Sequence, residues 1–194
     1  MDGLIGSRIC GGNTAYKRAQ SDYYPTPTEV TAALLQYLQL PRGSRIWEPA
    51  CGEGYMANVF IQSGYAVTST DLNDQGFGEC GVDFLTADLR TCDWIITNPP
   101  FNLADLFIRR CAHHGKPFAL LLKSQYWHSK KRYTLFEGIP PSEILPLTWR
   151  PDFLFKTRGS GSPLMDCIWC VWRPETAAKT TYIPLQRPAS YDKP

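Results

Sequence analysis

The chain has 194 residues, of which 43% are hydrophobic and 20% charged. This composition is typical of one globular domain with a complete core and excludes a disordered chain. The net charge of +2 excludes a strongly basic surface over the whole domain, so any nucleic-acid contact must come from a local patch. No apolar run approaches the roughly 20 residues that span a bilayer, and no apolar signal segment begins the chain, so we expect a cytoplasmic protein with no membrane partner.

Three parts of the chain differ in composition. Residues 1–20 are Gly-rich without periodicity, and we predict a flexible arm. Residues 21–173 form one predicted domain. Residues 174–194 are Pro-rich, and we expect a tail that lies extended over the surface or is disordered.

Helical and extended segments alternate within the domain. Apolar residues at helical spacing predict helices at 27–40, with Thr26 as N-cap, at 55–63 and at 103–114. Short apolar runs predict strands at 45–48, 65–70, 82–85, 92–97, 117–122, 143–147 and 164–172. This alternation is typical of parallel β-α-β units, so we predict a doubly wound α/β sheet.

Polar residues follow several of these strands. Glu48, Asp71, Asp83 and Asn98 all lie at or just after a predicted strand end. Ligands bind at the carboxyl ends of strands in such sheets, so these four side chains predict one cleft.

Asn98-Pro99-Pro100-Phe101 is the most specific stretch. Two prolines fix the backbone and remove two N–H donors, which leaves the Asn98 side-chain oxygen and the Pro99 carbonyl as acceptors beside an aromatic ring. This arrangement suits a planar group that carries an NH2. The alternative is a stiff turn that leaves a strand.

A short Gly-containing loop, residues 49–54, joins the strand that ends at Glu48 to a helix. It allows a ligand to approach the backbone closely, but it has no Lys before a Ser or Thr and is therefore no triphosphate-binding loop. Asp71 can accept both hydroxyls of a ribose, or it can cap a turn. Cys167 and Cys170 have C-x-x-C spacing without a second pair of ligands, so we predict no metal site.

Together, Glu48-Pro-Ala-Cys-Gly-Glu-Gly54, Asp71, Asp83-Phe84 and Asn98-Pro-Pro-Phe101 resemble the S-adenosylmethionine-dependent methyltransferases that modify adenine N6 in DNA. The motif order is similar to the γ arrangement, and the small size is similar to that of phage or prophage members. The resemblance covers about residues 22–172. It implies a class I, Rossmann-like fold with a mostly parallel seven-stranded sheet whose last strand is antiparallel.

The resemblance also implies roles for individual residues. Asn98, Pro99, Pro100 and Phe101 would be catalytic, with Phe101 stacked on a target base flipped out of double-stranded DNA. Asp71 would hold the ribose of the cofactor, and Asp83, with Asp88 as its rival, the adenine amino group. The implied cofactor contacts are Tyr24, Thr26, Pro27, Glu48, Pro49, Ala50, Cys51, Gly52, Gly54, Asp71, Leu72, Asp83, Phe84 and Asn98.

Basic and aromatic residues interleave in the segment 123–133, which suits phosphate contacts and stacking, although a solvated helix start would look the same. Phe153 is the candidate for a second stacking face, with core packing as the alternative. The predicted substrate contacts are Lys123, Lys130, Lys131, Arg132, Phe153 and Arg158.

Three alternatives stay open: the same chemistry on RNA, methylation of a protein glutamine amide, and a catalytically idle nucleic-acid-binding relative. We expect no separate target-recognition domain, and hence a short or relaxed target sequence. The expected location is a bacterial cytoplasm or that of a phage-infected host.

Overall fold

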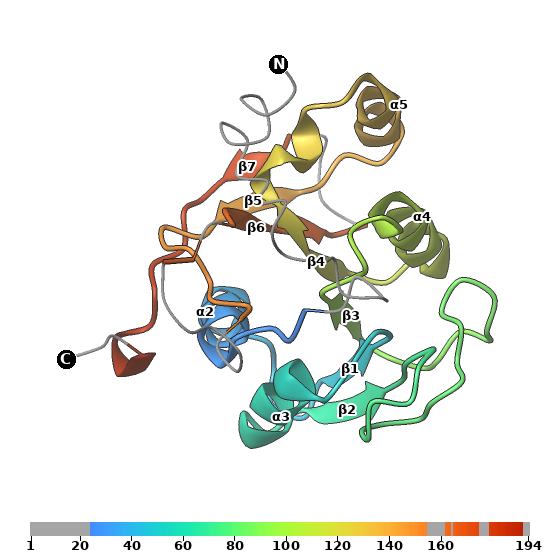
Figure 1. The fold of residues 1–194 in the computed structure, drawn as a ribbon. Coiled ribbons are helices and arrows are strands. Elements are labelled where there is room, and N and C mark those ends of the chain that lie inside the picture. Colours follow the sequence, from blue (N-terminus) through green and yellow to red (C-terminus); the bar gives the residue numbers. More distant parts are fainter. Residues whose placement is uncertain (1–23, 155–161, 164, 175–178, 192–194) are drawn as a thin grey trace, which may run out of the picture.

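The computed structural model of the chain describes residues 24–154, 162–163, 165–174 and 179–191. The predicted arm, residues 1–20, lies outside them. Within the described part, seven strands form one sheet in the order β2-β1-β3-β4-β6-β5-β7 (Figure 1).

The strands are β1 (Arg45–Glu48), β2 (Ala66–Ser69), β3 (Trp94–Thr97), β4 (Phe118–Lys123), β5 (Glu143–Pro146), β6 (Cys167–Trp172) and β7 (Thr181–Tyr182). The α-helices are α2 (Thr28–Leu38), α3 (Tyr55–Gln62), α4 (Ala104–His114) and α5 (Lys130–Gly138), and two short 3-10 helices are η1 (Ser124–Trp127) and η2 (Ala189–Tyr191).

The direction of the strands confirms the predicted fold class. β1 pairs in parallel with both β2 and β3, and β3 with β4. β6 runs antiparallel to β4 and β5, between which it lies. The chain proceeds from β1 to β2 on one side and then to β3 on the other, so the strand order reverses between β1 and β3. Such a reversal opens a crevice at the carboxyl ends of these strands.

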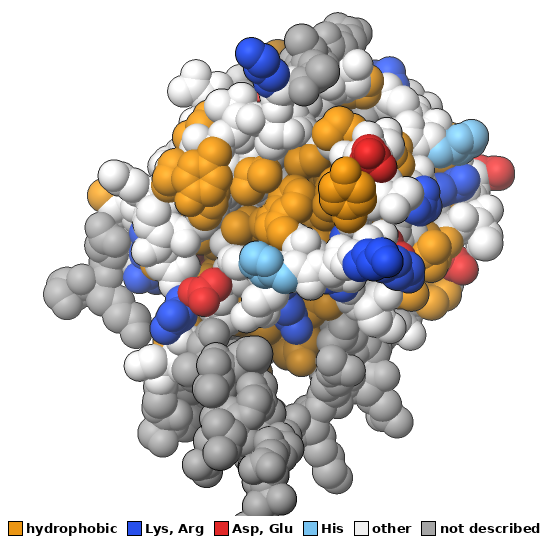
Figure 2. Space-filling model, turned by 90° about the horizontal axis from the view of Figure 1, so that it is seen from above, with side chains coloured by type: hydrophobic (Ala, Val, Ile, Leu, Met, Phe, Trp, Pro, Cys, Tyr) orange, Lys and Arg blue, Asp and Glu red, His pale blue; other side chains and the backbone are white. Residues whose placement is uncertain are grey.

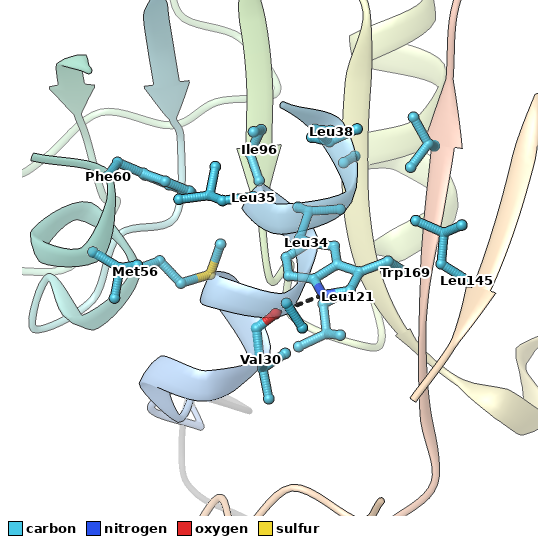
Figure 3. Close-up of a cluster of buried hydrophobic side chains, with 14 of the residues drawn as sticks. Val30, Leu34, Leu35, Leu38, Met56, Phe60, Ile96, Leu121, Leu145 and Trp169 are labelled. Carbon is cyan, nitrogen blue, oxygen red and sulfur yellow. Dashed lines mark hydrogen bonds between the residues drawn. The ribbon is translucent and has the colours of Figure 1, made fainter. Parts of the chain in front are cut away.

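Each face of the sheet has its own hydrophobic core. Alternate residues of a strand point to opposite faces, so that Trp169 of β6 packs on one face and its neighbours Ile168 and Cys170 pack on the other. Helices α2 and α3 cover the first face, and α4 and α5 the second. Figure 3 shows α2 lying on the sheet with Leu34 directed towards it and the indole nitrogen of Trp169 donating a hydrogen bond of 3.1 Å to the carbonyl of Val30.

Residues 82–85 do not form the predicted strand. The carboxylate of Asp83 accepts a hydrogen bond from the backbone N–H of Leu85, and the Asp83 carbonyl accepts those of Thr86 and Ala87. These local bonds make a turn, because an Asp side chain competes with the strand for backbone donors.

Two elements were absent from the sequence prediction. β7 lies in the Pro-rich segment and pairs with β5, and Leu185 behind it is buried. Helix α5 begins within the segment 123–133, where a helix start was the alternative to a substrate-binding loop, and continues to Gly138. It buries only Leu135, so its sequence carries little apolar periodicity.

Candidate functional site

A cleft of about 630 Å³ opens at the carboxyl ends of β1, β2 and β3. This volume is in the range of small-molecule sites. Its lining residues are Tyr24, Thr26, Glu48, Pro49, Ala50, Cys51, Tyr55, Met56, Asp71, Leu72, Asn73, Gln75, Val82, Asp83, Phe84, Leu85, Asn98, Pro99, Pro100, Phe101, Asn102, Leu103 and Phe107.

All four predicted catalytic residues and 11 of the 14 predicted cofactor contacts are in that set. The structure therefore brings the sequence motifs together in one place, because parallel strands end at the same edge.

The side chain of Asn98 is held in one orientation. Its Nδ2 donates to the backbone carbonyl of Tyr24 at 3.3 Å and to the Thr26 hydroxyl at 3.0 Å. A carbonyl can only accept, so the amide nitrogen must face the Tyr24–Thr26 segment. The opposite atom, Oδ1, is buried and accepts no hydrogen bond from the described residues. A buried acceptor without a donor costs free energy, so Oδ1 is a candidate acceptor for an N–H group of a ligand.

Thr26 thus does not serve as the predicted N-cap. α2 begins at Thr28 with Pro27 as its cap residue and no side-chain hydrogen bond to the helix end. The Thr26 hydroxyl is used across the cleft on Asn98 instead.

Asp71 is buried and connects the two loops that follow β1 and β2. Its Oδ2 accepts the Gly52 N–H at 2.9 Å and its Oδ1 accepts the Asn73 N–H at 2.8 Å. Both oxygens are positioned by backbone donors while the residue lines the cleft. The turn-capping interpretation and the ligand-binding one are therefore compatible.

Glu48 is a buried acid at the end of β1. Burial raises the pKa of its carboxyl well above the usual value, the N–H of Ala57 opposes this by hydrogen bonding, and the charge of Asp71 adds to it. Its Oε2 has no hydrogen-bond partner among the described residues. Burial, with the charges of Glu48 and Asp71, also raises the pKa of the Cys51 thiol to about 12, so Cys51 stays protonated and unreactive.

Asp83 lines the cleft and Asp88 does not, which favours Asp83 for the predicted role. Phe84 beside it is largely a core residue, with its ring 5.1 Å from that of Trp47 and 4.8 Å from that of Phe107.

Three predicted cofactor contacts, Pro27, Gly52 and Gly54, do not line the cleft. The two glycines shape the loop beneath it. Gly54 has φ +79°, and a Cβ there would lie 2.5 Å from Cγ of Phe77. A side chain at this position would have to displace the Phe77 ring.

The rings around Phe101 differ from the expectation. Phe153 is only 4% exposed and does not line the cleft, so it belongs to the core. The ring stacked on Phe101 is that of Tyr24, with centroids 5.8 Å apart and planes at 30°. The ammonium of Lys123 lies 4.2 Å from the centroid of Phe101.

Three other predicted substrate residues, Lys130, Lys131 and Arg132, do not line the cleft. Arg132 is used internally: its guanidinium lies 3.8 Å over the Tyr126 ring and donates to the Tyr126 carbonyl. Lys131 pairs with Asp105 at 3.0 Å, and Lys130 is exposed. Arg158 lies outside the described residues. On the face that carries α5 and β7, hydrophobic side chains gather in the middle and the Lys and Arg side chains lie separated around them (Figure 2).

Nine residues that line the cleft were not among the predicted site residues: Tyr55, Met56, Asn73, Gln75, Val82, Leu85, Asn102, Leu103 and Phe107. Most belong to loops and helix starts that directly follow the predicted motifs, so their proximity to Gly54, Asp71 and Phe101 was the available signal.

No family model and no curated protein matches the chain. Solved structures do match. The methyltransferase subunit of a type I restriction-modification system from Streptococcus thermophilus has a TM-score of 0.64 at 13% identity, over 93% of this chain and 50% of that one. A candidate RNA methyltransferase from Pyrococcus horikoshii has a TM-score of 0.62 at 12% identity, over 87% of this chain and 98% of that one.

A candidate class I S-adenosylmethionine-dependent methyltransferase from Listeria monocytogenes has a TM-score of 0.59 at 16% identity, over 93% and 71% of the two chains. The 194-residue chain therefore has the class I methyltransferase fold. The chain spans about half the length of the restriction-modification subunit. In a class I methyltransferase fold the crevice between β1 and β3 is the place for a ligand, and the cleft lies there. Among the described residues, none of the helices has the length and apolarity to cross a membrane.

Proposed function

We propose that the protein transfers a methyl group from S-adenosylmethionine to the exocyclic N6 amine of an adenine flipped out of DNA. The observation that carries this proposal is the orientation of Asn98. Both N–H groups of its amide face protein acceptors, and Oδ1 is left to accept an N–H from a ligand.

The residues of the cleft fit the cofactor. Asp71 offers a carboxylate positioned by the Gly52 and Asn73 N–H groups, which suits the two hydroxyls of a ribose. Glu48 offers a buried oxygen without a partner among the described residues, and Asp83 would accept a hydrogen bond from the adenine amine of the cofactor. S-adenosylmethionine supplies a methyl group on a positively charged sulfur.

The chain's own residues act on the amine that accepts the methyl group. An amine conjugated into adenine is a poor nucleophile. Accepting its N–H bonds at Asn98 Oδ1 and the Pro99 carbonyl localises the lone pair on nitrogen and orients it. The oriented nitrogen would take the methyl group, the neutral thioether would be the leaving group, and the amine proton would then pass to water. Such catalysis comes from orientation and hydrogen bonding and needs no general base before attack.

DNA is the proposed substrate because the sequence of the Glu48–Cys51 loop resembles that of the corresponding loop in the DNA methyltransferases. The fold is shared by the restriction-modification subunit and by the candidate RNA methyltransferase. RNA is therefore the second candidate, and a glutamine amide also fits the same two acceptors.

The test is to express the protein in a host without adenine methylation and to map N6-methyladenine by single-molecule sequencing. Asn98→Ala should abolish the signal, because losing one preorganised hydrogen-bonding group that stabilises a transition state costs about 100- to 1000-fold in rate. Asn58→Ala, an exposed residue of α3 outside the cleft, is the matched control. Methylated RNA or protein with unmodified DNA would show that the substrate is RNA or protein. Binding of the cofactor without methylation of DNA, RNA or protein would indicate a catalytically idle relative.

A further inference from the structure

Tyr24 occupies the space in which a target base would stack. Its ring is stacked on that of Phe101 and also meets the buried ring of Phe153 edge-on, with centroids 6.4 Å apart and planes at 74°. Phe153 therefore supports Tyr24 from behind and reaches no ligand itself.

The spacing between these rings is too small for a base. A base between two rings needs about 6.8 Å between their planes, because stacked bases are about 3.4 Å apart. The Tyr24 and Phe101 centroids are 5.8 Å apart with the planes at 30°, which is the geometry of two rings in direct contact. The acceptor beside them is closed as well, since Asn98 Oδ1 is buried although Asn98 lines the cleft.

Tyr24 is joined to the same acceptor through its backbone. The Tyr24 carbonyl accepts the 3.3 Å hydrogen bond from Asn98 Nδ2, so the residue that carries the ring also orients the Asn98 amide. Pro25 and Pro27 stiffen the segment. Because the carbonyl belongs to the backbone, a turn of the Tyr24 ring about its side-chain bonds leaves this hydrogen bond in place.

We propose that Tyr24 is the second stacking wall of the target site and that it closes this site in the free protein. The incoming planar base separates Tyr24 from Phe101 by about the thickness of one base, about 3.4 Å, and is then held between the two rings. This inference rests on the proposed function, because it takes the base of that reaction as the occupant.

The test is steady-state methyl transfer to unmethylated plasmid DNA with wild-type protein, Tyr24→Leu and Tyr24→Phe. S-adenosylmethionine affinity is measured by calorimetry and Tm by thermal unfolding. Tyr24→Leu should lower kcat/KM for DNA about 5- to 150-fold, because one base–aromatic stack is lost, and by a larger factor than it weakens S-adenosylmethionine binding. Tyr24→Phe keeps an aromatic ring and should lose less than Tyr24→Leu. Tyr182→Leu removes an exposed Tyr of β7 outside the cleft and is the control.

Each other outcome has a distinct meaning. A Tyr24→Leu protein as active as wild type overturns the stacking wall alone, and so does a loss of cofactor affinity and Tm that matches the loss of activity. Wild-type protein inactive on DNA overturns the proposed function and with it the base as occupant. If Tyr24→Leu does not fold, photocrosslinking wild-type protein to DNA with 5-iodouracil at the mapped target position decides: a crosslink to Tyr24 supports the wall, and crosslinks that omit Tyr24 overturn it.

Discussion

The amide of Asn98 donates a hydrogen bond to the hydroxyl of Thr26, and 72 positions separate these residues in the chain. The bond joins the end of β3 to the segment before α2. It makes one segment responsible both for a wall of the cleft and for the orientation of the proposed catalytic acceptor.

We expect Thr26→Val to lower kcat about 2- to 13-fold, the worth of one net hydrogen bond, because Asn98 loses an acceptor while the side-chain shape is kept. Thr26→Ser keeps the hydroxyl and should retain the rate. The measurement is single-turnover methyl transfer at saturating cofactor. Equal rates for Thr26→Val and wild type would show that the Tyr24 carbonyl alone orients Asn98.

Asp71→Asn should weaken S-adenosylmethionine binding about 10- to 150-fold, because a charge-assisted hydrogen bond is worth about 1.5–3 kcal/mol. An amide also presents an NH2 to one of the two backbone donors that the carboxylate now accepts. Asp74→Asn is the control, since Asp74 lies in the same loop and accepts only the Gly76 N–H among the hydrogen bonds recorded for the described residues. Calorimetry checks the prediction, and equal affinities of the two variants would contradict it.

Gly54→Ala should destabilise the protein more than Gly43→Ala. Both glycines have φ near +80°, and both substitutions carry the cost of a left-handed conformation, about 1–2 kcal/mol. Only Gly54 adds a clash, with the Phe77 ring at 2.5 Å, whereas a Cβ at Gly43 meets nothing within 4 Å among the described residues. Overpacking adds about 1–3 kcal/mol. Denaturant unfolding measures the difference, and adding Phe77→Ala should reduce it. Equal losses at the two glycines would refute the close approach.

Glu48→Gln should change how stability depends on pH. Burial raises the pKa of the Glu48 carboxyl, so the folded protein holds a proton at pH values where the unfolded chain has lost it. The free energy of unfolding therefore falls as pH rises from about 4.5 through the folded-state pKa. The neutral amide removes this loss, so the variant should gain on the wild type as pH rises.

Tm of the ligand-free proteins, measured between about pH 4.5 and 8, tests this prediction. Glu137→Gln, an exposed residue of α5, should run parallel to the wild type. Parallel curves for Glu48→Gln and wild type would mean that the buried carboxyl has no raised pKa.

The errors in the sequence prediction have physical causes. The run 82–85 looked like a strand, but the side chain and carbonyl of Asp83 take the N–H groups of the next residues. β7 was hidden by the neighbouring prolines, and its two residues are extended because the edge of β5 supplies partners. Phe153 was assigned to the substrate because nothing in the sequence distinguishes a ring behind the cleft wall from a ring in it.

Local sequence patterns are enough to predict the α/β alternation, the carboxylates at the ends of β1 and β2, and the Asn-Pro-Pro-Phe turn after β3. Their meeting in one cleft follows from the rule that parallel strands end together. The direction in which the Asn98 amide faces and the ring that covers Phe101 depend on the packing of distant segments. Both depend on Tyr24 and Thr26, more than 70 residues earlier in the chain, and no local pattern specifies a contact between segments that meet only when the sheet has formed.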